Sequence, residues 1–209
     1  MRRATIALLL LVTAAVALHA QTATVEEFTG KVEYRVAGGS WTAVSVGLSI
    51  PLDATISTGF GSTAVLSVAS SEIQVAQLTR LTIEELADNG QTVSTGVFVP
   101  VGRVRASVQQ APDRSTDFEI RTAQSTAAVR GTEFEVDNWQ LVVSEGIVEF
   151  ADALARAQLV GAGEVSTIGG DGPSDPFDEL NNQANIGDGG GPGDFEGGPA
   201  GSGYITVRW

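Results

Sequence analysis

Two glutamates and their neighbours are the residues of this chain best spaced to bind a ligand. Glu133 and Glu135 lie two apart in an alternating segment, and a β-strand would project both carboxylates from one face together with any cation they hold. Arg130 and Thr132 stand just before them. The alternative, which we favour, is that Arg130 pairs with one of these glutamates across the sheet and that the segment serves folding.

A second set of oxygen ligands lies near the C-terminus. Segments 171–179 and 187–197 place carboxylates between glycines, and calcium prefers flexible carboxylate and carbonyl oxygens. The glycine-rich pattern occurs once, whereas calcium-binding motifs of that kind stack in series. A solvated acidic linker is therefore the better interpretation, and we expect no metal site and no cofactor.

The sequence lacks residues that several kinds of catalytic site require. The chain has no cysteine, its one histidine is His19, and its one methionine is Met1. Zinc sites built from His and Cys, thiol nucleophiles and Ser-His-Asp triads therefore need residues that the chain beyond its N-terminus does not supply. A carboxylate pair could hydrolyse glycosides, but no acid lies in a recognisable motif. We expect a protein that is not an enzyme.

The N-terminus has the pattern of a secretory signal peptide, which we assign to residues 1–20. Arg2 and Arg3 precede an apolar run, residues 6–18, and small residues follow, with cleavage after Ala17 or after Ala20. The run is too short to span a bilayer comfortably, although an uncleaved anchor is the alternative. The sequence thus predicts export to the periplasm or cell envelope, with no transmembrane segment after cleavage.

The charge balance argues against nucleic-acid partners. The formal net charge is −13, and removal of Arg2 and Arg3 would make it more negative. A surface of this sign repels nucleic acid and anionic lipid.

Hydrophobic periodicity predicts an all-β domain over residues 24–168. Apolar residues recur mainly with period two, broken by turn residues every 8 to 12 positions. The pattern slips once: Val129 continues an odd-numbered apolar set and Phe134 begins an even-numbered one. We expect a β-bulge there, with Gly131 at positive φ, so that Val129 and Phe134 both face inward.

The same segment carries a family resemblance. "TAQSTAAVRGTEFEV" (122–136) resembles the most recognisable part of the FecR domain, supported by "EGIVEF" (145–150), "LVGAGEVSTI" (159–168) and the opening at 30–68. The resemblance implies a jelly-roll-like antiparallel β-sandwich in the periplasm. In the type case it also implies a sensor that relays the state of an outer-membrane ferric-citrate transporter to a sigma factor.

Here only a signal peptide precedes the domain, so we expect a different arrangement. The leading interpretation is an exported, non-enzymatic binding module with a protein partner in the cell envelope. The alternative is a periplasmic sensor of a small ligand, a metal chelate such as ferric citrate or a glycan, that relays to a separate membrane partner.

The composition changes at Gly169. Glycine, proline and acidic residues dominate from there onward, and such a segment buries too little apolar surface to offset its ordering entropy. We expect a disordered tail: an acidic linker at 169–203, followed by "YITVRW" (204–209), a strand that could dock on a sheet edge.

Overall fold

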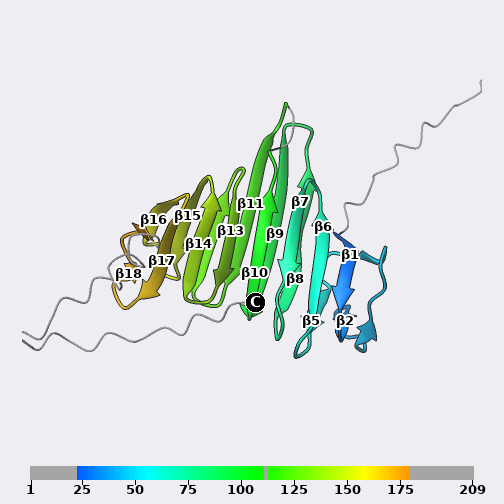
Figure 1. The fold of residues 1–209 in the computed structure, drawn as a ribbon. Coiled ribbons are helices and arrows are strands. Elements are labelled where there is room, and N and C mark those ends of the chain that lie inside the picture. The colour runs from blue at the N-terminus through cyan, green and yellow to red at the C-terminus, as the bar shows by residue number, and fades with distance from the viewer. Residues whose placement is uncertain (1–22, 111–112, 179–209) are drawn as a thin grey trace, which may run out of the picture.

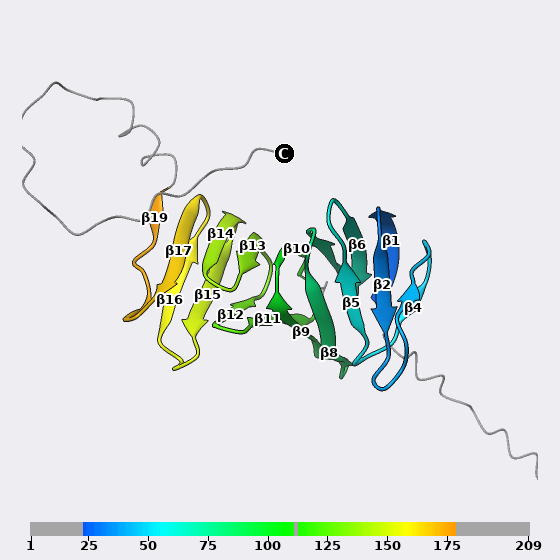
Figure 2. The same cartoon turned by 90° about the horizontal axis from the view of Figure 1, so that it is seen from below.

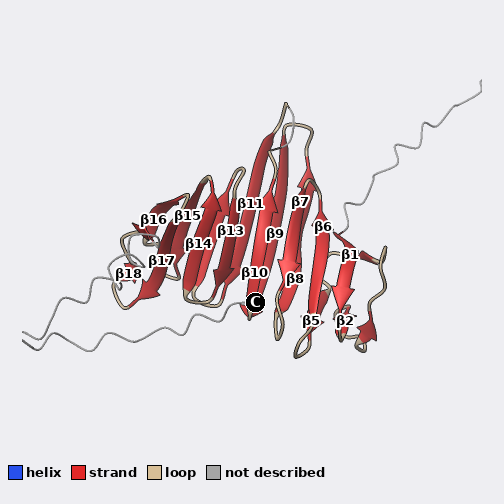
Figure 3. Ribbon diagram, viewed as in Figure 1, coloured by secondary structure: helices blue, strands red, loops and turns tan. Residues whose placement is uncertain are grey.

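The domain is a sandwich of two β-sheets. The computed structural model describes residues 23–110 and 113–178, and every regular element in this part of the chain is a strand (Figure 3). The two sheets face each other along their whole length (Figures 1 and 2). This confirms the expected all-β sandwich. The signal peptide, most of the linker and the terminal hexapeptide lie outside the described residues.

In both sheets the strands follow the order of the chain, except that β4 lies beyond β1 and β3 lies beyond β2 at the N-terminal edge. Sheet 1 consists, in spatial order, of β18 (Gly172–Pro173), β17 (Glu164–Gly169), β14 (Gln140–Glu145), β13 (Glu133–Asp137), β10 (Arg103–Val108), β7 (Ser71–Val75), β6 (Thr63–Val68), β1 (Ala23–Thr29) and β4 (Ser49–Ile50), and β19 (Phe177–Asp178) also pairs with β17. Sheet 2 consists of β16 (Ala157–Gly161), β15 (Ile147–Asp152), β12 (Ser125–Val129), β11 (Ser115–Thr122), β9 (Thr92–Val101), β8 (Arg80–Asp88), β5 (Thr55–Thr58), β2 (Val32–Arg35) and β3 (Thr42–Ala43).

The chain passes repeatedly from one sheet to the other as it advances along the sandwich. One pair of neighbours is parallel, β9 with β11, while the remaining described pairs are antiparallel. The parallel pair arises because β10 lies between them in sequence and belongs to sheet 1. The chain therefore returns to sheet 2 running in its earlier direction, as a crossover connection requires.

The core lies between the sheets. Alternate residues are buried along most long strands, as in β9 and β11, whereas only the first half of β8 alternates in this way. Phe118, Phe134 and Phe150 are fully buried, and each stabilises the fold by about 1.5–3 kcal/mol relative to an exposed side chain. Since both sheets contribute to one continuous cluster, the sandwich has a single core.

The slip in the hydrophobic pattern has a different cause from the one expected. β12 ends at Val129 in sheet 2, and β13 begins at Glu133 in sheet 1. The intervening residues cross between the sheets, so the inward-facing parity is reset without a bulge at Gly131. Gly131 is also absent from the positive-φ glycines. Val129 and Phe134 are both buried, as predicted.

The domain continues beyond the expected boundary at Ile168. β18 and β19 pair with β17, and the Ser166 hydroxyl donates a hydrogen bond to the Ser174 carbonyl at 2.8 Å. Gly172, at φ +107°, permits the tight return between the strands. Residues 169–178, which composition assigned to the linker, therefore belong to the sandwich edge.

Candidate binding surfaces

The predicted site residues lie at the crossover between β12 and β13, on two different surfaces. Arg130 is exposed and makes no ion pair with the described residues. Thr132 is buried between the sheets' ends, with its backbone N–H and C=O both bonded to Val108, at 3.1 and 2.8 Å. Glu133 and Glu135 share the outer face of sheet 1, as the spacing predicted. The four side chains therefore do not converge on one point.

Glu135 belongs to an ion-pair network with β10. Its carboxylate lies 3.2 Å from Arg103 and 3.4 Å from Arg105, and Arg103 also contacts Asp137 at 2.7 Å. Partial burial favours the neutral form of Arg103, but the hydrogen bond and charge of Asp137, together with Glu135, raise its pKa above its ordinary value. The expected pairing of Arg130 with a glutamate is thus wrong: the register Arg105↔Glu135 selects the arginines of β10.

Glu133 has a different environment. It faces Glu145 of β14 on one side and Ser107 of β10 on the other, and Ser107 in turn faces Glu72 of β7. Like charges directly opposite each other on antiparallel strands are destabilising. No group of three or more metal-ligating side chains in the described part of the chain could hold an ion. We call Glu72, Ser107, Glu133 and Glu145, which follow one another across four strands of sheet 1, the acidic row.

Thr132 and Gly146 fix the geometry of the crossover. A Cβ at Gly146 would lie 2.5 Å from the Thr132 methyl carbon and 2.9 Å from the Gly131 carbonyl oxygen, and Gly146 has φ +85°. The chain therefore needs glycine at 146, in the turn between β14 and β15. A Cβ added at Gly131 would lie 3.7 Å from its nearest neighbour, the Gln110 Cβ, so that position has room for a side chain.

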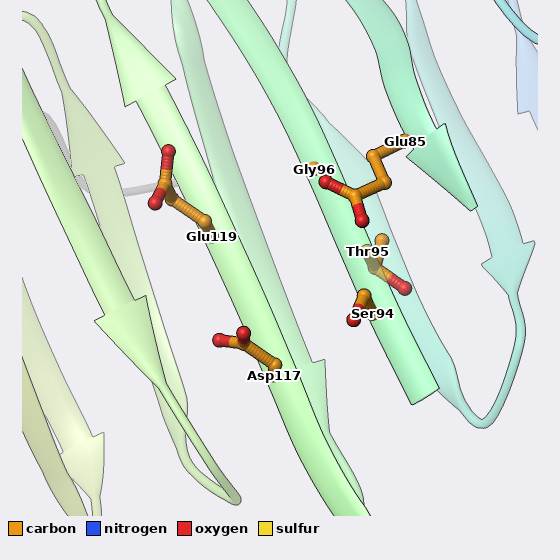
Figure 4. Close-up of a pocket in the computed structure, with 6 residues that line it drawn as sticks. All are labelled: Glu85, Ser94, Thr95, Gly96, Asp117 and Glu119. Carbon is orange, nitrogen blue, oxygen red and sulfur yellow. The ribbon is translucent and has the colours of Figure 1, made fainter. Parts of the chain in front are cut away.

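A shallow depression of about 90 Å³ lies on the outer face of sheet 2. Figure 4 shows its lining residues, which are Glu85, Ser94, Thr95, Gly96, Asp117 and Glu119. Gly96 forms its floor because it has no side chain, and Glu85 reaches over it (Figure 4). The carboxylates of β11 point away from Glu85, so the three acids do not surround a common point. The alternating sequence could have indicated this depression only through the glycine at position 96.

The fold is a two-sheet β-sandwich, and the comparison with family models adds one match. Residues 54–149, from the residue before β5 into β15, match the family model described as FecR protein. This match agrees with the FecR resemblance found in the sequence.

Solved structures show more distant likenesses. Two crystal structures of a candidate anti-sigma factor from Parabacteroides distasonis ATCC 8503, at 2.50 and 1.65 Å resolution, are 17% and 16% identical in sequence, with TM-scores of 0.49 and 0.46. Each match covers 64% of this chain, and it spans 64% and 65% of the other chains. No curated protein gives a significant match. Among the described residues no helix is long and apolar enough to cross a membrane.

Proposed function

We propose that this chain is an exported, non-enzymatic FecR-domain module that binds a protein partner in the periplasm or cell envelope. The observation that carries the proposal is the FecR match over 54–149, which covers the central strands of both sheets. The signal-peptide pattern at residues 1–20 supports export. The missing histidine and cysteine beyond the leader support binding rather than catalysis.

The small-ligand alternative receives less support from the geometry. Pockets for small molecules usually enclose about 300–1,000 Å³, whereas the depression beside Gly96 measures about 90 Å³ and is open to solvent. Its acids also do not converge (Figure 4). The outer face of sheet 1, with the row Glu72, Ser107, Glu133 and Glu145, offers a broader surface for a basic partner.

The test is cross-linking capture in intact cells. A photo-reactive residue placed at Ser107, at the centre of the acidic row, should capture a defined envelope protein. One placed at Gln158, on the sandwich edge outside the row, is the matched control, because Gln158 and Ser107 are both partly buried. The full chain is compared with one ending at Asp178, because the last described strand ends there.

The expected result is capture of the same protein by both chain lengths from position 107. Capture that disappears with residues 179–209 would assign recognition to the tail instead of the FecR domain. Capture of no envelope protein by either chain, or recovery of the chain in the cytoplasmic fraction, would contradict the proposal.

A further inference from the structure

The turns at one end of the sandwich differ in composition from those at the other. Strand registers place the connections β5–β6, β7–β8, β9–β10, β11–β12, β13–β14, β15–β16 and β17–β18 at the same end, which is the lower edge in Figure 1. Four of these seven connections carry a large exposed apolar side chain, and a fifth such residue, Val101, ends β9 directly before the turn at Gly102. The residues, which we call the apolar ridge, are Phe60, Leu78, Val101, Trp139 and Leu154.

Beyond the N-terminal edge, the turns at the opposite end are polar. From β6 to β17, its described turn residues are Ala, Ser, Asn, Gly, Gln, Asp, Arg and Thr, with no large apolar residue. The remaining exposed large apolar residues lie elsewhere: Ile147 begins β15 at the opposite end, Leu159 lies on β16, and Val36, Val46 and Leu52 lie in the connections of the N-terminal edge, those of Val36 and Leu52 at the opposite end. Single exposed apolar residues need no explanation, but their concentration on the turns of one end does.

Hydrogen bonds join the ridge turns to one another. The Leu78 N–H donates to the Gly59 carbonyl at 3.3 Å, and the Gly61 N–H donates to the Gln77 side chain at 2.8 Å. These bonds tie the turn that carries Phe60 to the turn that carries Leu78.

The same linkage continues along the ridge. The Arg103 N–H donates to the Thr79 hydroxyl at 3.0 Å, and the Asn138 amide donates to the Pro100 carbonyl at 3.3 Å. The Ile168 N–H donates to the Trp139 carbonyl at 2.7 Å. The ridge is therefore held in place before it meets anything, and these backbone groups have partners that survive the loss of water.

The conformation and exposure of Leu78 are both unfavourable for a leucine in the isolated domain. Leu78 has φ +56°, a left-handed conformation that favours Gly or Asn, and it is 57% exposed. It is the one large apolar residue among the described non-glycine residues with positive φ. Both the backbone and the solvent would favour another residue here, which points to a contact outside the domain.

The arrangement of charged side chains also differs between the ridge end and the opposite end of the sandwich. Five basic residues stand at or next to the ridge turns: Lys31, Arg80, Arg103, Arg121 and Arg156. All of them except Arg80 form an ion pair with a carboxylate. The opposite end carries Glu72, Glu133 and Glu145, which have no basic partner among the described residues, as well as Arg130 and the pair of Arg114 with Asp88. The ridge end is thus much closer to neutral than the net charge suggests.

We propose that the apolar ridge inserts into the interface of a zwitterionic phospholipid bilayer. A row of protruding tips fits a fluid surface, which needs no complementary grooves, and Trp139 and Phe60 are residue types that partition to the membrane interface. The sandwich would then stand on end. The acidic row of sheet 1, at the opposite end, would remain free for the protein partner.

The experiment is flotation of the exported, processed chain with phosphatidylcholine vesicles, with its N-terminus verified by mass. The ridge variant combines Phe60→Ser, Leu78→Asn and Trp139→Ser. The matched control combines Val46→Ser, Ile147→Ser and Leu159→Ser, three residues of similar exposure away from the ridge. We expect about a hundredfold loss of vesicle binding in the ridge variant, because each side chain removed from water contributes several-fold to tenfold, and less than a twofold loss in the control.

Leu78→Asn alone distinguishes a binding role from a structural one. We expect its Tm to be unchanged or higher by about 2 °C, because Asn accepts positive φ at lower cost, while vesicle binding falls several-fold. A lower Tm would show that Leu78 serves folding and would overturn this part of the reasoning.

Other results would overturn the membrane inference itself. These are failure of the unsubstituted chain to float, unchanged flotation of the ridge variant, or an equal loss in the control. If the ridge variant instead loses photo-capture of the protein partner while the unsubstituted chain does not float, the ridge is a protein contact. In that case the proposed function stands and the membrane inference fails.

Discussion

Replacing Gly146 with alanine should destabilise the domain far more than the same change at Gly131. At Gly146 the new Cβ would lie 2.5 Å from the Thr132 methyl carbon, and the backbone has φ +85°. The left-handed conformation costs an alanine about 1–2 kcal/mol, and the overlap with a buried side chain costs about 1–3 kcal/mol more. We expect a total loss of about 2–4 kcal/mol in the free energy of unfolding.

Gly131 provides the matched control within the same crossover. Its nearest neighbour would be the Gln110 Cβ at 3.7 Å, an ordinary contact, and it does not have positive φ. Gly131→Ala should therefore be neutral or stabilise by up to about 1 kcal/mol, because alanine restricts the unfolded chain.

The assay is urea and thermal unfolding of the chain, each followed by circular dichroism. For a domain of this size, a loss of about 2–4 kcal/mol corresponds to a fall in Tm of about 5–15 °C. In a double variant, Thr132→Ser with Gly146→Ala, the methyl carbon that overlaps is removed. Part of the loss should then be recovered, while the backbone contribution remains. A larger loss at Gly131 than at Gly146 would refute the crossover geometry and restore the bulge interpretation.

Three further predictions concern polar groups of the sandwich. The buried Thr132 hydroxyl has no hydrogen-bond partner among the described residues, so Thr132→Val should leave the free energy of unfolding unchanged or raise it by about 1 kcal/mol; a loss above that size in urea unfolding would reveal a partner for the hydroxyl. Arg103→Gln removes the contacts to Glu135 and Asp137 and should cost about 1 kcal/mol, because the side chain is partly exposed; the loss should shrink in 1 M salt, and a salt-independent loss would argue against an electrostatic origin. Burial of Asp152 favours its protonated form, but the N–H groups of Arg156 and Leu154 and the Arg156 guanidinium lower its pKa below 3.8. The charged carboxylate therefore stabilises the fold above about pH 4 and loses this effect as pH falls through the lowered pKa. The difference in unfolding free energy between the native chain and Asp152→Asn should be present at pH 7 and reduced at pH 3, and an equal difference at both would contradict the charge effect.

Alternation along the chain determined the fold class and the assignment of many residues to the core. Val129 and Phe134 were placed inward correctly because side chains alternate across a strand whatever sheet the strand joins. The FecR resemblance rested on local motifs and was likewise available from the sequence. The carboxylates at 133 and 135 share a face for the same reason of period two.

The choice of sheet was decided by the tertiary structure. A bulge within one strand and a crossing between two facing sheets reset the inward parity in the same way, so the slip between Val129 and Phe134 could not distinguish them. The partner of Glu135 followed from that choice, because strand register selected Arg103 and Arg105 over the nearby Arg130.

The distribution of surface groups was also decided in three dimensions. The net charge of −13 predicted repulsion from anionic surfaces, but a total charge says nothing of where the charges lie. Phe60, Leu78 and Trp139 are far apart in sequence, and each looks like a stray apolar residue in a turn. Only the strand directions bring their turns to one end, because antiparallel pairing returns every second connection to the same edge of the sandwich.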